Sequence, residues 1–318
     1  MVQNWLIAFG AGVASALLVA TVATGSALAL PLFYLAPLPV LIVGLGWSHL
    51  SALVAASTAA VGIGVFFGLD LLTAYVAGVG LPAYALAYLA LMARQERPDG
   101  PFEWFPIGRV VLAAAILGCL AVAALIPLVA GSVQGYQAAL REMFQAMFEE
   151  RPGIPGADTS RLVDLLVIVM PPAAAVVTMV TQLANLWLAA HAARLSGRLM
   201  RPWPDLAAIS VPRASVALLI GALIATSLDD GFIGLLAELL GATLVMAVAF
   251  IGLATIHWIT RGAAGRTLVI ATVWIAALAL GWPFAALALL GIAETLFGLR
   301  GRFKRGGPAK GPPAANDG

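Results

Sequence analysis

The sequence predicts an all-α fold, a polytopic transmembrane helix bundle of about eight to ten spans with one outer amphipathic helix. Hydrophobic residues make up 62% of the chain and charged residues 10%, whereas soluble domains are about half apolar and a quarter charged. The mean hydropathy is +1.01. Apolar runs long enough to cross about 30 Å of hydrocarbon recur from one end of the chain to the other.

The first four spans lie in residues 1–93, which contain one acidic residue, Asp70, and no basic residue. Glycines, prolines and turn-forming residues divide this region into four predicted helices. The helices lie at about 5–25, 31–46, 49–68 and 71–93. We expect the second one to be short and irregular, because Pro31, Pro37 and Pro39 each remove a backbone donor and crowd the preceding turn.

The remaining spans follow a first polar loop. They are predicted at about 110–130, 161–190, 213–228 and 231–258. The second of these is kinked by Pro171-Pro172. Residues 267–299 would form about 50 Å of helix, which is too long for one span. A Gly-Trp-Pro break at 281–283 therefore predicts a short hairpin here.

Residues 131–160 interrupt the apolar pattern and predict an amphipathic helix that does not span the membrane. One edge of this helix is apolar, and the opposite face carries glutamines, glutamates and an arginine. The apolar edge consists of Tyr136, Leu140, Met143 and Met147, widened by Phe144 and Phe148. The segment ends at the turn-forming sequence RPGIPG (151–156).

Basic connections alternate with poorly basic ones along the last two-thirds of the chain. The basic ones are the loops 94–109, 191–213 and 261–266, and the tail from Arg300 to Lys310. The positive-inside rule predicts that these face the cytoplasm and that 131–160, 229–230 and 281–283 face outward. We therefore predict a multi-pass protein of a bacterial cytoplasmic (inner) membrane, with its lipid bilayer as a partner. Residues 1–299 would form the membrane domain and 300–318 a basic, Gly/Pro-rich cytoplasmic tail.

Small residues recur at every fourth position on two predicted helices. The first set is Ala8, Gly12, Ala16 and Ala20, and the second is Ala52, Ala56 and Ala60. Such stripes let helix backbones approach closely in lipid, where packing drives association. They are typical of internal packing, and they also make Ala52, Ala56 and Ala60 candidates for docking a partner helix.

Polar side chains at membrane depth are costly and become candidates for function. Thr178, Gln182 and Asn185 share one face of the span 161–190. This face could line a ligand site or form interhelical hydrogen bonds. Glu238 could bind a cation or a basic group, take a proton, or pair with a polar neighbour near the outer interface. Glu294 is expected to pair with Arg300.

Known catalytic motifs are missing from the sequence, so we expect no enzyme. There is no G-x-x-x-x-G-K-[ST], no H-E-x-x-H and no G-x-S-x-G. The single cysteine, Cys119, cannot form an internal disulfide or a cysteine-based metal cluster. A membrane aspartate dyad of Asp70 and Asp229 is disfavoured because both lie at predicted turns. We expect no metal, no cofactor and no nucleic-acid partner.

The stretch PLFYLAPLPVLIVGLGWSHLSALVAASTAA (31–60) resembles the N-terminal part of the YybS-like family of bacterial membrane proteins. That family is distantly similar to the substrate-binding S components of energy-coupling-factor transporters and to the rod-shape protein MreD. S components dock on a coupling subunit through A-x-x-x-A faces, which Ala52, Ala56 and Ala60 match. S components have about six spans, fewer than predicted here, and no substrate-binding motif of theirs matches this chain. The resemblance therefore implies a fold and a mode of assembly, and no ligand.

Two functional hypotheses follow. The first is an S-component-like subunit that binds a small molecule for uptake, together with separate coupling and ATPase subunits. In it, the broken second helix and the amphipathic segment would cover a cavity near Thr178, Gln182 and Asn185. The second is a non-catalytic scaffold in an envelope or morphogenesis complex. A wide polar pocket open to the outside would favour uptake, and a sealed, apolar interior around Gln182 would favour the scaffold.

Overall fold

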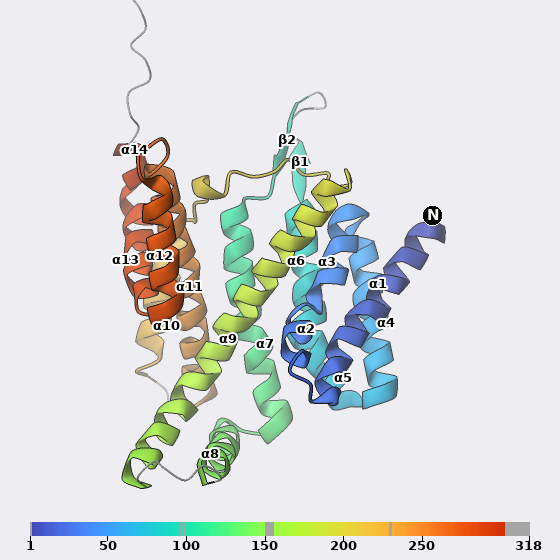
Figure 1. Cartoon of the computed structure of the whole chain (residues 1–318), viewed down its shortest axis with the longest axis vertical. Coiled ribbons are helices and arrows are strands. Elements are labelled where there is room, and N and C mark those ends of the chain that lie inside the picture. Colours follow the sequence, from blue (N-terminus) through green and yellow to red (C-terminus); the bar gives the residue numbers. More distant parts are fainter. Residues whose placement is uncertain (1, 96, 98–99, 150–155, 229–230, 303–318) are drawn as a thin grey trace, which may run out of the picture.

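Helices form nearly all of the regular structure in the computed structural model of the chain (Figure 1), which describes residues 2–95, 97, 100–149, 156–228 and 231–302. The elements in chain order are α1 (Val2–Ala20), η1 (Thr21–Thr24), α2 (Ala29–Tyr34), α3 (Pro37–Gly46), α4 (His49–Phe67), α5 (Leu69–Tyr75), η2 (Val76–Gly80), α6 (Leu81–Leu91), β1 (Ala93–Gln95), β2 (Phe102–Trp104), α7 (Ile107–Ala130), α8 (Val133–Glu149), α9 (Gly156–Leu195), η3 (Leu206–Ala208), α10 (Ala214–Ala225), α11 (Phe232–Ile259), α12 (Arg266–Leu280), α13 (Pro283–Phe297) and α14 (Leu299–Arg302). The predicted all-α transmembrane fold is confirmed.

Seven helical stretches within the described residues are long and apolar enough to cross a membrane. They are Gln3–Thr24, Ala29–Gly46, His49–Phe67, Leu69–Leu91, Ile107–Leu128, Thr159–Leu195 and Phe232–Ile259. Three shorter apolar helices, α10, α12 and α13, complete the bundle. A helix of 15 residues, such as α12 or α13, is about 22 Å long and falls short of the hydrocarbon thickness. The predicted count of eight to ten is therefore reached only when these short helices are included.

Two of the spans are interrupted where prolines remove backbone donors. The predicted second helix consists of α2 and α3, and α3 begins at Pro37. The fourth contains a π-helical turn, η2, directly before α6, whose second residue is Pro82. In an α-helix the residue at position 82 would donate to the Gly78 carbonyl, and proline has no N–H to do so. Both interruptions thus leave carbonyl groups that need another donor.

The helices form two groups, with α9 running diagonally past the first one (Figure 1). Helices α1–α7 make up the N-terminal group and α10–α13 the C-terminal group. Helix α11 is the most buried span among the described residues and packs against α7, α9, α10 and α13. A Cβ atom added to Gly252 of α11 would lie 1.9 Å from the Leu287 carbonyl oxygen of α13, and one added to Gly291 would lie 1.8 Å from that of Val248. Only glycine fits this crossing.

The basic connections lie at one end of the molecule and α8 lies at the other (Figure 1). The β1–β2 hairpin pairs Arg94 with Glu103 in antiparallel register and stands at the same end as α14. The predicted grouping of the loops 94–109, 191–213 and 261–266 therefore agrees with the structure. Most of the basic tail, and the expected turn at 229–230, lie outside the described residues. That the basic end faces the cytoplasm stays a prediction.

Candidate functional site

Gln182 and Asn185 of α9 donate hydrogen bonds to backbone carbonyls at the two helix interruptions. The Gln182 Nε2 group donates to the Gly78 carbonyl of η2 at 2.9 Å. The Asn185 Nδ2 group donates to the Tyr34 carbonyl at the end of α2 and to the Thr181 carbonyl of its own helix, each at 2.8 Å. Both side chains belong to residues that are only 2% exposed. Irregular backbone at membrane depth is tolerated where neighbouring side chains satisfy it, and these two amides do so.

A second pair of side chains bonds to the same interrupted helices. The Ser15 hydroxyl of α1 donates to the Ala36 carbonyl, between α2 and α3, at 2.7 Å. Its oxygen lies 3.0 Å from the Tyr75 hydroxyl at the end of α5. Because serine has one proton to donate, the tyrosine is the donor in this second bond. We call Ser15, Tyr75, Gln182 and Asn185 the polar seam.

Two acceptors of the polar seam have no donor among the described residues. They are Gln182 Oε1 and Asn185 Oδ1, and both are buried. Rotating either amide would place its NH₂ group where the oxygen now lies and would break the bonds to the backbone carbonyls, so the hydrogen-bond network fixes the assignment. These oxygens are the positions where a hydrogen-bond donor, a water molecule or a ligand group, could be received.

The other two ligand-lining candidates do not join the polar seam. Thr178 lies on the same face of α9, but its hydroxyl donates to the Ala174 carbonyl of its own helix at 2.8 Å. Glu238 is exposed on α11. The structure therefore brings together Gln182 and Asn185, and leaves Thr178 and Glu238 outside. Nothing in the sequence pointed to Ser15 and Tyr75 beyond their polarity within apolar helices.

Helix α8 does not cover the polar seam, so that part of the uptake hypothesis is wrong. Its buried Phe144 packs against Val163 and Val167 of α9, and Arg141 forms an ion pair with Asp164 at 2.9 Å. Residue 167 precedes Thr178 by 11 positions, about 16 Å along the helix. The first turns of α9 extend beyond the rest of the bundle, and α8 lies beside them (Figure 1).

The small-residue stripes pack the chain's own helices. A Cβ atom added to Gly12 would lie 2.4 Å from the Ala55 carbonyl oxygen, which brings α1 and α4 into close contact. Ala52 and Ala56 are also buried, within the core formed with α3 and α6. Ala60 is partly buried. Internal packing thus accounts for these residues, and docking of a partner on them stays a prediction.

The loop between α9 and α10 (residues 196–213) runs across the basic end and connects the two helix groups. On the N-terminal side, Arg198 stacks on Trp47, with its guanidinium carbon 4.4 Å from the ring centroid. Arg201 donates to the Ala90 carbonyl at the end of α6, at 3.1 Å. Desolvation lowers the pKa of Arg201 from its usual value.

The same loop is held on the C-terminal side by two arginines. Arg261 pairs with Asp205. Arg300, which is only 8% exposed, donates to the Ile209 carbonyl at 2.8 Å and to the Thr255 hydroxyl at 3.0 Å. Its Nε lies 3.5 Å from Glu294 Oε1, so the predicted pair is confirmed. Thr255 is not predictable from the sequence, because a lone threonine in an apolar helix gives no indication of its partner.

Apolar spans of bilayer length, polar side chains bonded to helix interruptions, and basic residues gathered at one end define a multi-pass integral membrane protein. The chain belongs to the family described as "Predicted membrane protein (DUF2232)", a family of unknown function whose model matches residues 13–295. No curated protein and no solved structure matches it. The resemblance to YybS-like proteins, S components and MreD is not confirmed by these comparisons and stays an expectation.

Proposed function

We propose that the protein is a non-catalytic scaffold subunit of a complex in a bacterial cytoplasmic membrane. The observation that carries the proposal is the burial of the polar seam away from solvent. Gln182 and Asn185 are each 2% exposed and donate to backbone carbonyls of neighbouring helices. Substrate recognition needs polar groups that converge on an accessible pocket, whereas these groups hold the chain's own helices together.

The exposed apolar face of α12 supports an assembly role. This helix packs on α13, and Ala277 is the one buried residue among its described positions. Leu268, Ile275 and Leu278 are each about two-thirds exposed or more. Helix α12 is about 22 Å long, which is shorter than the hydrocarbon core of about 30 Å. If lipid alone surrounded its exposed face, the bilayer would have to become thinner there. Packing against a longer helix of a partner subunit would remove that mismatch.

The experiment is native mass spectrometry of the protein purified from its own host in mild detergent, recording both protein and small-molecule adducts. The proposal expects a membrane-protein partner at fixed stoichiometry, and less of that partner when Ile275→Asn disrupts the apolar face of α12. The matched control is Val61→Asn, an exposed apolar position on α4. A partner lost equally in both variants, or no partner at all, would contradict the scaffold.

A second candidate is a substrate-binding subunit for uptake, together with coupling and ATPase subunits. Gln182 Oε1 and Asn185 Oδ1, which lack a donor among the described residues, favour it, because interrupted helices often mark binding sites in transporters. In the same experiment this function predicts a small molecule bound at fixed stoichiometry. If the small molecule is bound to the wild-type protein and absent from a folded Gln182→Met variant, the ligand site includes Gln182. That result would overturn the scaffold proposal.

A further inference from the structure

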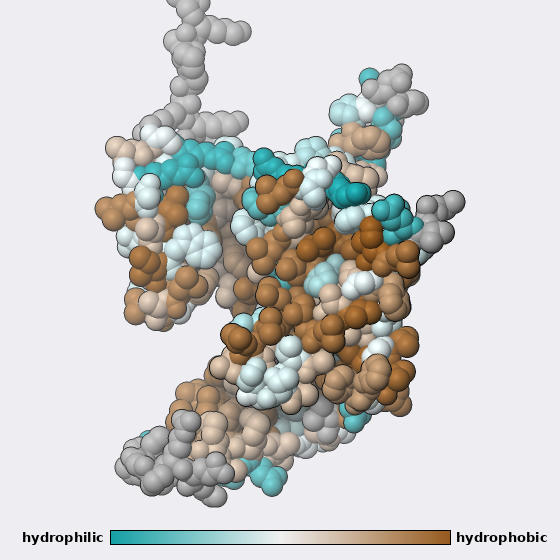
Figure 2. All heavy atoms as spheres, turned by 45° about the vertical axis from the view of Figure 1, so that its right-hand side comes forward, coloured by the Kyte–Doolittle hydropathy of each residue, from teal (hydrophilic) through white to brown (hydrophobic). Residues whose placement is uncertain are grey.

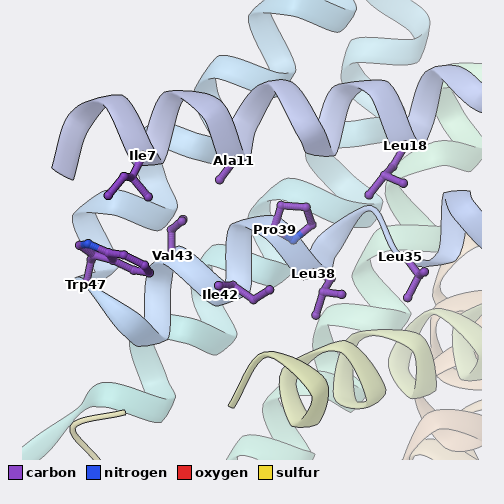
Figure 3. Close-up of a pocket in the computed structure, with 9 residues that line it drawn as sticks. All are labelled: Ile7, Ala11, Leu18, Leu35, Leu38, Pro39, Ile42, Val43 and Trp47. Carbon is purple, nitrogen blue, oxygen red and sulfur yellow. The ribbon is translucent and has the colours of Figure 1, made fainter. Parts of the chain in front are cut away.

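A long apolar groove runs between α1 and α3 (Figure 3). Its volume is about 400 Å³, and the residues that line it are apolar along its whole length. Leu18 and Leu35 lie at one end, Ala11 and Ile42 in the middle, and Trp47 at the other end. This volume falls within the range of pockets that bind small molecules or lipid chains.

The groove has the length of a lipid chain within one leaflet. On α1 it extends from Ile7 to Leu18, which is 11 residues or about 16 Å of helix. One leaflet contributes about half of the 30 Å hydrocarbon core. The Trp47 end contacts Arg198 of the basic end, and Leu35 at the opposite end lies in the break between α2 and α3. The groove therefore starts at the interface and ends near the membrane centre.

An arginine stands at the interfacial end of the groove. Arg198 is exposed, and its guanidinium carbon lies 4.4 Å from the centroid of the Trp47 ring. A Cβ atom added to Gly46 would lie 3.7 Å from the Arg198 Cβ atom, so the base of this side chain is held against the end of α3. In the part of the chain that the structure describes, no carboxylate forms a salt bridge with Arg198.

We propose that this groove binds one acyl chain of an anionic phospholipid, whose headgroup phosphate contacts Arg198. The apolar lining suits the chain, and the exposed guanidinium suits the negative headgroup, because arginine binds phosphate through paired N–H donors. A purely apolar occupant, such as a hydrophobic helix, would leave the cation without a counterion. The proposal does not depend on the scaffold function.

The test is lipid competition in native mass spectrometry. Purified protein is incubated with equimolar phosphatidylglycerol and phosphatidylcholine of the same chain length. We expect bound phosphatidylglycerol to exceed phosphatidylcholine by about fivefold or more, since one basic residue at a membrane surface contributes roughly that factor. Arg198→Gln should bring the ratio close to one. Arg213→Gln, an exposed arginine at the start of α10, is the matched control and should keep the wild-type ratio.

The acyl-chain half of the proposal is tested by filling the groove. Ala11→Phe should reduce retention of both lipids several-fold, and Ile42→Phe serves as a second variant if the first fails to fold. Equal lipid ratios in wild type and Arg198→Gln would overturn the proposal. An equal fall of the phosphatidylglycerol-to-phosphatidylcholine ratio in Arg198→Gln and Arg213→Gln would also overturn it. That result would mean that general surface charge, and not Arg198, selects the anionic lipid. Undiminished retention in a folded groove-filling variant would show that the lipids bind elsewhere.

Discussion

Single side chains donate to backbone carbonyls that have lost their α-helical donors. Proline at position 82 leaves the Gly78 carbonyl without its α-helical donor, and the Gln182 amide donates to that carbonyl from a residue 104 positions later in the chain. Asn185 donates to the Tyr34 carbonyl across 151 positions, because Leu38, four residues after Tyr34, donates its N–H to Leu35 instead at the break between α2 and α3. A carbonyl without a partner in hydrocarbon costs several kcal/mol. These residue-scale bonds therefore stabilise the two most irregular helices of the bundle.

Gln182→Leu should lower the stability of the folded protein by about 1–3 kcal/mol, because it leaves the part-buried Gly78 carbonyl without its hydrogen-bond donor. Thermal unfolding in a fixed detergent measures the change. Thr178→Val is the control, since the Thr178 hydroxyl bonds only within α9 in the described structure, and its effect should stay within about 0.5 kcal/mol.

A second substitution can show whether Gln182→Leu destabilises the protein through the lost hydrogen bond or through lost packing. Pro82→Ala restores a backbone N–H that can donate to the Gly78 carbonyl, so it should recover part of the stability lost in Gln182→Leu. Strictly additive effects of the two single substitutions in the double variant would contradict the proposed compensation.

The same two residues show what the sequence could and could not predict about the site. The polar face of Gln182 and Asn185 was visible in the sequence, as was the broken second helix with its prolines. Their bonds to other helices were not, because these join segments more than a hundred residues apart and depend on where α9 crosses the bundle. Thr178 shares that face by helical spacing, yet its hydroxyl bonds to its own helix.

At the scale of elements, hydropathy predicted helix positions well and connections poorly. The predicted helix at 49–68 is α4, and the predicted break at 281–283 is a turn in which Gly281 adopts a φ of 72°. In the sequence, the α9–α10 loop is recognisable only as a basic connection. Its contacts with Ala90, Arg261 and Arg300 depend on elements that are far apart in the chain and meet at one end, which local patterns do not encode.

The Asp205–Arg261 ion pair should make this loop sensitive to acid. The hydrogen bond from Arg261 is the main cause that lowers the pKa of Asp205 below its ordinary value of 3.8. A carboxyl with a lowered folded pKa stabilises the fold above its unfolded pKa, and the contribution is lost as the pH falls through the folded value. Hydrogen exchange of residues 203–209 should therefore accelerate as the pH drops below about 4.

Asp205→Asn should show faster exchange of the same residues at neutral pH and should abolish the acid-dependent step, because the asparagine side chain does not titrate. Exchange rates are corrected for the intrinsic effect of pH by comparison with residues of α11. A step of unchanged size in Asp205→Asn would assign the acid sensitivity to another group.

Helix α8 presents apolar side chains in two directions. Phe144 is buried against α9, whereas Met143 and Met147 are 52% and 43% exposed. A helix of 17 residues is marginal in water without such contacts. We therefore predict that the exposed methionines contact the bilayer surface, as expected for an amphipathic interfacial helix.

Met143→Asp should weaken this surface contact without changing the packing on α9. Thermal stability in detergent should stay within about 0.5 kcal/mol of wild type, while hydrogen exchange of residues 136–148 in lipid vesicles should accelerate. Phe144→Asp is the matched comparison on the neighbouring position and should accelerate exchange in detergent as well as in vesicles. Identical behaviour of the two variants would mean that α8 has a single contact face.

At the scale of the whole molecule, charge separates the two ends. The β1–β2 hairpin, the α9–α10 loop and α14 gather arginines at one end, while α8 lies at the other (Figure 1). The surface between them is largely apolar, as the brown regions of Figure 2 show on the face in view. Four arginines of the basic end stack on tryptophans within the described residues. Arginine and tryptophan together are typical of a membrane–water interface.

Fusions of alkaline phosphatase should establish which end faces the cytoplasm. Alkaline phosphatase folds to an active enzyme only outside the cytoplasm, so a fusion after Gly156, next to α8, should be active. Fusions after Gly197 and Gly262, in loops of the basic end, should be inactive, because arginine-rich loops are retained on the cytoplasmic side. Fusions of a cytoplasmic reporter such as β-galactosidase at the same positions should give the opposite pattern and control for expression. An active phosphatase at both Gly197 and Gly262 would invert the orientation. The Arg198 end of the α1–α3 groove would then face the outer leaflet.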